Sequence, residues 1–191
     1  MSSETVGSSS ALGFLSVLTH PQHGLFGGYL LLNTAGRPLE FHCTAPIKPN
    51  RAQQILYGPT LEPFLYGEQI GRTLLAKATV EPMFVFTDCP PALAVRDHVC
   101  VPVALVLPRR ESLQTEHDRR TLRFDAPHQS GVAVTPLELG RNRLAIAGDA
   151  QEDRRLLTER LAEVTESFDL AEPFTRIRDA IEEAQQAVRS G

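Results

Sequence analysis

Tryptophan is absent from this sequence, and methionine and lysine occur only twice each. Seventeen of the nineteen basic residues are arginine, so a lysine amine nucleophile would have to come from Lys48 or Lys77. Phenylalanine occurs nine times and tyrosine three times. The core is therefore predicted to be aliphatic, with phenylalanine as its large side chain.

Long apolar runs are also missing. No stretch approaches the roughly 20 residues that a membrane-spanning helix needs, so no membrane association is expected. The first ten residues contain no basic residue, which argues against a secretory leader. Three cysteines without regular spacing do not form a disulfide framework. Together these absences favour a cytoplasmic protein with reduced thiols.

The formal charge of −4 is unevenly distributed. Residues 149–191 hold eleven acidic and six basic residues, whereas residues 1–148 are nearly neutral. This balance argues against nucleic acid as a partner. The arginines between Arg109 and Arg123 are interleaved with acids and lack aromatic neighbours, so weak nucleic-acid contact there is only a further alternative.

Hydrophobic patterning predicts an α+β fold with a mixed, mainly antiparallel sheet. A helical pair is inserted after the third strand, and a second amphipathic pair ends the chain. The predicted strands are 13–19, 29–32, 39–44, 83–87, 99–107, 121–125, 131–139 and 143–147. The predicted organisation is a disordered tail over 1–12, an α+β body over 13–148 and a helical segment over 149–189.

Two capping patterns predict the last two helices. Asp149 with Glu152 begins the first, and Asp169 with Glu172 begins the second. The second helix carries a narrow apolar stripe of Phe174, Ile177, Ile181 and Val188, with spacing typical of a helix that packs on one groove or one partner helix. This stripe predicts contact with the body, with a protein partner or with a second copy.

A set of thiols and imidazoles offers a different chemistry. If their strands are neighbours, Cys43, Cys89, His98 and Cys100 have the side chains of a three-thiolate, one-imidazole zinc site. Cys89 with His98 or His42 is also a candidate reactive thiol. The alternative interpretation is that these cysteines and histidines are ordinary core or loop residues, because no metal-binding or cysteine-hydrolase signature surrounds them.

No convergent set of catalytic side chains is apparent, so no catalytic residue is predicted and the sequence leans away from an enzyme. The first hypothesis is therefore a non-enzymatic binding or assembly module acting through protein–protein contacts. The alternative is a small Cys/His-dependent metal protein or enzyme.

Overall fold

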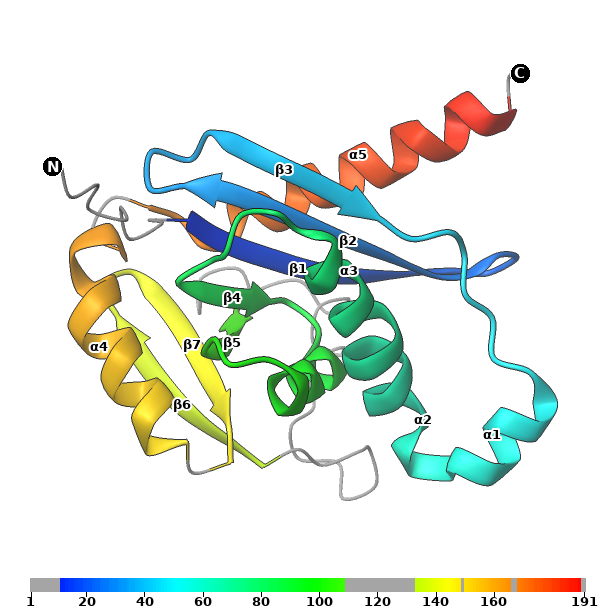
Figure 1. The fold of residues 1–191 in the computed structure, drawn as a ribbon, viewed down its shortest axis with the longest axis horizontal. Coiled ribbons are helices and arrows are strands. Elements are labelled where there is room, and N and C mark those ends of the chain that lie inside the picture. Colours follow the sequence, from blue (N-terminus) through cyan, green and yellow to red (C-terminus); the bar gives the residue numbers. More distant parts are fainter. Residues whose placement is uncertain (1–10, 109–132, 149, 166–167, 190–191) are drawn as a thin grey trace, which may run out of the picture.

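A single seven-stranded mixed sheet forms the centre of the molecule, with helices on both faces (Figure 1). The computed structural model describes residues 11–108, 133–148, 150–165 and 168–189. The strand order is β3-β2-β1-β4-β5-β7-β6. The predicted α+β class, with a mainly antiparallel sheet and helices after the third strand, is confirmed.

Four of the six strand pairings are antiparallel, and β1–β4 and β4–β5 are parallel. Parallel neighbours need a crossover, which the helices after β3 and after β4 supply. The strands are β1 (Ala11–His20), β2 (Gly24–Asn33), β3 (Pro38–Cys43), β4 (Phe84–Thr87), β5 (Val103–Leu107), β6 (Val134–Leu139) and β7 (Asn142–Ala147).

The helical elements fall into three groups along the chain. The first crossover contains α1 (Arg51–Tyr57), η1 (Gly58–Thr60), α2 (Leu61–Pro63), the π-helix η2 (Phe64–Arg72) and α3 (Thr73–Lys77). The second crossover is the 3₁₀ helix η3 (Pro90–His98), and the chain ends in α4 (Gln151–Thr165) and α5 (Glu172–Arg189).

The hairpin of β2 and β3 forms as the sequence predicts. Asn33 accepts hydrogen bonds from the backbone amides of Ala35 and Arg37 through its side-chain oxygen. Gly36 has φ of 76°, a conformation that glycine adopts without steric cost. The turn residues therefore set this register.

Two hydrophobic clusters cover the two faces of the sheet. One face packs against α4 and α5, where the rings of Phe14, Phe86 and Phe174 meet. The other face packs against η2 and η3. The core is aliphatic and phenylalanine-rich, as the composition predicts.

Gly67 and Gly71 allow η2 to approach η3 closely. A Cβ at Gly67 would lie 2.7 Å from the backbone nitrogen of Val95, and one at Gly71 would lie 2.9 Å from the Val95 side chain. Two glycines four residues apart in a helical pattern predict this close approach. The same pattern predicts one regular helix from Thr60 to about Ala78, whereas Phe64–Arg72 is a π-helix. No local sequence pattern distinguishes this π-helical stretch from an α-helix.

The proline at position 102 precedes a central strand. The sequence predicts a strand over 99–107 with an edge position or a bulge at Pro102, whereas β5 begins at Val103. The carbonyl of Pro102 accepts a hydrogen bond from the amide of Val85. Because the proline lies before the strand, its missing donor is not needed by the ladder. The predicted strand 121–125 lies outside the described residues.

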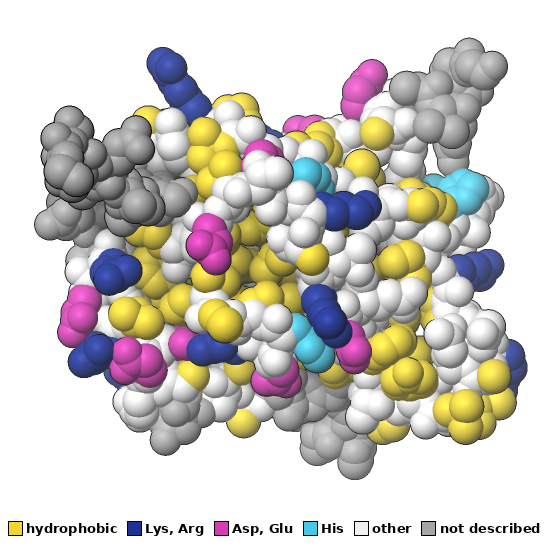
Figure 2. Space-filling view, in the orientation of Figure 1, with side chains coloured by type: hydrophobic (Ala, Val, Ile, Leu, Met, Phe, Trp, Pro, Cys, Tyr) yellow, Lys and Arg dark blue, Asp and Glu magenta, His cyan; other side chains and the backbone are white. Residues whose placement is uncertain are grey.

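Some apolar surface remains exposed over α1, at the lower right of Figure 2. Ile55 and Leu56 are 64% and 81% exposed, and α1 buries no residue. This helix therefore contributes nothing to the core. Within the described residues, no helix is both long and apolar enough to cross a membrane.

Candidate functional site

Helix α5 lies against β1 and β2, and it packs tightly on the sheet at Gly28. A Cβ at Gly28 would stand 2.4 Å from Ile177 Cγ2 and 2.8 Å from Ile181 Cδ1. Phe174, Ile177 and Ile181 are each at most 2% exposed. Three of the four residues predicted to bind a partner thus form core contacts, and the side chain of Val188 lies outside the described residues.

The C-terminal end of α5 diverges from the β1–β2 hairpin (Figure 1). A cavity of about 430 Å³ opens there, between α5, the hairpin and the segment after β3. Its lining residues are His23, Phe26, Cys43, Thr44, Ala45, Pro46, Ile181, Ala184 and Gln185. Five of these nine side chains are small: Cys43, Thr44, Ala45, Pro46 and Ala184.

The lining is largely apolar. Phe26 and Ile181 are buried, and the described residues around the cavity include no carboxylate, ammonium or guanidinium group. Thr44 contributes a hydroxyl that already accepts a hydrogen bond from the amide of Gly27 at 2.9 Å. An apolar cavity with a few polar groups at its rim is the usual form of a small-molecule site.

The β1–β2 turn holds the histidines at one side of the cavity. The Nδ1 atom of His20 accepts hydrogen bonds from the backbone amides of Gln22 and His23, at 3.1 and 3.2 Å. Its proton therefore lies on Nε2. The His20 ring lies against the His23 ring at a tilt of 33°, with centroids 4.6 Å apart, and it meets the Phe26 ring edge-on. These contacts fix the position of His23 at the cavity.

A polar cluster lies where the middle of β1 and the carboxyl end of β4 meet Arg178 of α5. Ser16 donates to Asp88 Oδ1 at 2.8 Å, and Arg178 of α5 donates to Asp88 Oδ2. Cys89 lies 3.4 Å from the carbonyl of Val17. Burial, then the charge of Asp88, raises the pKa of the Cys89 thiol well above its usual range. The thiol is therefore protonated at neutral pH, which is unfavourable for a nucleophile.

The structure does not bring the predicted zinc ligands together. Cys43 ends β3, which β2 and β1 separate from the strand that precedes Cys89. Three strand spacings of roughly 4.8 Å place these sulfurs far beyond ligand distance. His98 and Cys100 are exposed at the end of η3. Among the described residues, no group of three or more His, Cys, Asp or Glu side chains is arranged to hold a metal ion.

The sequence analysis singled out two of the lining residues, Cys43 as a zinc ligand and Ile181 as part of the apolar stripe, but it did not predict that they line a cavity. Phe26, Thr44 and Ala184 come from three distant segments with no motif, so only the tertiary fold brings them together. The segment from Arg109 to Arg123 lies outside the described residues.

No protein-family model matches this chain, and no curated protein matches it. Solved structures of endonuclease V share part of its architecture. The catalytic domain of human endonuclease V is 14% identical, with a TM-score of 0.45 over 96% of this chain and 84% of that one. The Ciona intestinalis enzyme in complex with a 23mer DNA containing an inosine is 13% identical, with a TM-score of 0.39 over 80% of this chain and 78% of the other.

These findings correct two predictions. The interpretation as a protein-assembly module is wrong, because three residues of the apolar stripe that motivated it, Phe174, Ile177 and Ile181, are buried in the core of this chain. The prediction that nucleic acid is an unlikely partner is withdrawn; it rested on the charge balance of the chain alone, and the Ciona intestinalis structures are complexes with DNA. At TM-scores below 0.5 the likeness assigns no activity to this chain.

Proposed function

We propose that this protein binds a small, uncharged, predominantly apolar molecule in the cavity beneath the C-terminal half of α5. The observation that carries this proposal is the cavity of about 430 Å³ between Phe26, the segment after β3 and Ala184. Ligand sites of proteins typically have volumes of about 300–1,000 Å³ and mainly apolar linings.

The lining chemistry supports an uncharged ligand. A charged group moved out of water needs a counter-charge or several hydrogen bonds, and the described lining supplies no counter-charge. Gln185 and Thr44 supply hydrogen-bonding groups that would orient a ligand carrying one or two polar atoms. The apolar body of the ligand would rest on Phe26 and Ile181.

A pair of fluorescent probes tests this proposal. N-phenyl-1-naphthylamine is uncharged, and 8-anilinonaphthalene-1-sulfonate is the same skeleton with a sulfonate. Titration of each into the protein should show saturable binding of the amine and weaker binding of the sulfonate, because the sulfonate finds no counter-charge. Equal affinity for the two would contradict the proposed ligand class.

A matched pair of substitutions tests the location. Ala184 lines the cavity and is exposed, whereas Ala171 is exposed just before α5 begins. Ala184→Phe should fill the cavity and weaken binding of the amine by about tenfold or more, which is about 1.4 kcal/mol. Ala171→Phe makes the same chemical change elsewhere and should leave affinity unchanged. Equal effects of both would remove the cavity as the site.

We also propose that the protein is located in the cytoplasm. All three cysteines are free thiols, two of them exposed. Free exposed thiols support a reducing environment such as the cytoplasm.

A further inference from the structure

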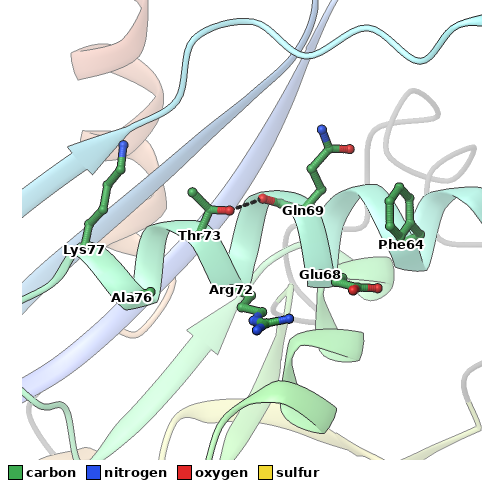
Figure 3. Close-up of a pocket in the computed structure, with 7 residues that line it drawn as sticks. All are labelled: Phe64, Glu68, Gln69, Arg72, Thr73, Ala76 and Lys77. Atoms are coloured by element: carbon green, nitrogen blue, oxygen red, sulfur yellow. Dashed lines mark hydrogen bonds between the residues drawn. The ribbon is translucent and has the colours of Figure 1, made fainter.

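A second hollow, of about 510 Å³, runs along the outer face of η2 and α3 (Figure 3). We call it the η2 groove. It is lined by Phe64, Glu68, Gln69, Arg72, Thr73, Ala76 and Lys77. Its chemistry differs from that of the apolar cavity, because it contains charged side chains, an amide and an aromatic ring.

The residues of the η2 groove lie on the side of the helix that faces away from η3 and the sheet. Gly67 and Gly71 turn toward η3, and Leu74 is fully buried against the sheet. The groove residues occupy the remaining face. The wide turns of the π-helix lie beneath most of them, and π-helical turns occur frequently at functional sites.

Figure 3 shows how the side chains are arranged. Lys77, Thr73 and Gln69 extend from one side of the helix, and Arg72 and Glu68 extend from the other. The ring of Phe64 lies at one end. A ligand lying along the helix would therefore meet an aromatic ring at one end and cations toward the other.

The two cations are available to a ligand. Arg72 and Lys77 are exposed, and neither forms an ion pair within the described part of the chain. Glu68 is half-buried and is the one carboxylate among the lining residues described. The groove thus has a net positive lining in a protein whose net charge is −4.

An unmatched acceptor lies between the ring and the cations. The side-chain oxygen of Gln69 is buried and has no hydrogen-bond partner. The hydroxyl of Thr73 donates instead to the backbone carbonyl of Gln69, at 2.6 Å. A buried acceptor without a donor is unfavourable, so turning this amide toward a donor on a ligand would be favourable.

The Phe64 ring at the aromatic end of the groove is held in place by a second ring. Phe64 stacks on Tyr57 of α1, with ring centroids 4.4 Å apart and an angle of 29° between the planes. A ring held in this way presents a fixed face, which is what stacking of a planar group requires.

We propose that the η2 groove binds nucleotide units of single-stranded nucleic acid. A base stacks on Phe64, an amino group of that base donates to Gln69 or Glu68, and phosphates contact Arg72 and Lys77. Stacking platforms beside a positive groove are the usual means of binding single strands. An acidic peptide would match the cations, but its carboxylate side chains have no aromatic face to stack on Phe64 and, when ionised, no donor for Gln69 or Glu68.

The acceptors further predict a preference among bases. Cytosine carries an exocyclic amine that donates to a carboxylate or an amide oxygen, and thymine has no such amine. Single strands of cytosine should therefore bind more tightly than single strands of thymine of equal length.

Fluorescence anisotropy with labelled dC12 and dT12 tests the proposal on the full chain. Removing both cations (Arg72→Ala with Lys77→Ala) should weaken dC12 binding by about tenfold or more, and it should reduce the magnitude of the salt slope by about 1.4, since each phosphate contact on a single strand contributes about 0.7. The control pair Lys48→Ala with Arg51→Ala removes the same charges from exposed positions outside the groove. It should change neither quantity.

Three results would overturn the proposal: no binding of either strand at low salt, equal weakening by both double variants, or displacement of dC12 by poly-glutamate as effectively as by unlabelled dC12. A Phe64→Leu variant that binds as tightly as the native chain would remove the stacking role. Competition with cytidine monophosphate distinguishes a free nucleotide from a strand as ligand, and displacement by either supports the site. The outcome is independent of the apolar cavity, because none of these residues lines it.

Discussion

Gly28 and Ile177 meet where helix α5 contacts the sheet, and the space between them does not admit a Cβ on the glycine. This contact explains why the amphipathic stripe of α5 belongs to the core. It also explains the cavity, because α5 is held firmly at this point and separates from the hairpin beyond it. The testable consequences begin with this pair.

Substituting Gly28→Ala should destabilise the protein by about 1–3 kcal/mol, the usual cost of overpacking a core. The added methyl group would overlap Ile177 and Ile181. Urea unfolding measures the change. The double variant Gly28→Ala with Ile177→Ala should be less destabilised than the sum of its single variants, because the second change removes the closest overlap. Strict additivity would mean that the two residues do not interact.

The ion pair between Arg96 and Asp153 joins η3 to α4. The carboxylate is 2% exposed and receives two hydrogen bonds from the guanidinium, at 2.6 and 2.9 Å. Asp153→Ala should lower the free energy of unfolding by up to about 3 kcal/mol. This value is the low end of the range for breaking a buried ion pair, because Arg96 remains partly exposed to water. Glu152→Ala, at an exposed neighbour, should change the free energy of unfolding by less than about 0.5 kcal/mol.

The protein should lose stability in acid because of Glu40. Hydrogen bonds from the Thr79 hydroxyl, from His42 and from the amides of Thr79 and Val80 lower its pKa from 4.5 to about 2. Because the folded state favours the carboxylate, this stabilisation is complete above pH 4.5 and is lost as the pH falls toward 2. Urea unfolding between pH 2 and 5 measures it.

A substitution isolates that contribution. Glu40→Gln should lower the free energy of unfolding at neutral pH and should reduce its further loss in acid. Glu81→Gln, at an exposed position nearby, should keep the pH dependence of the native chain. An unchanged pH profile in Glu40→Gln would show that other carboxylates cause the acid loss.

The three thiols should differ in reactivity. Cys43 and Cys100 are exposed, and Cys89 is partly buried with a raised pKa. N-ethylmaleimide reacts with the thiolate, so Cys89 should be modified last in the native protein. Peptide mass spectrometry at successive times gives the order. Rapid modification of Cys89 would contradict its protonated state and revive its candidacy as a nucleophile.

The sequence predicted the elements of this fold better than their interactions. The β2–β3 hairpin turns at Gly36, which has a positive φ, and α1 begins after Asn50, whose side chain accepts a hydrogen bond from the amide of Gln53 as a capping residue should. Such features depend on a few adjacent residues. The fold class followed from periodicity, which reports how each segment is buried.

The candidate site could not be predicted in this way. The stripe of α5 is compatible with packing on the body or on a partner, and periodicity does not distinguish them. Only the absence of a side chain at Gly28, about 150 positions earlier, decides the outcome. The cavity likewise depends on small residues of separate segments, such as Ala45 and Ala184, that lack any common spacing.

Protection of Cys43 by N-phenyl-1-naphthylamine tests the central claim most directly, since this thiol lines the cavity and Cys100 does not. The rate of N-ethylmaleimide modification is measured at both cysteines with and without the probe. At ten times its dissociation constant, the probe should slow modification of Cys43 by about tenfold and leave Cys100 unchanged. Unchanged rates at both thiols, or equal slowing of both, would show that the cavity is not the binding site.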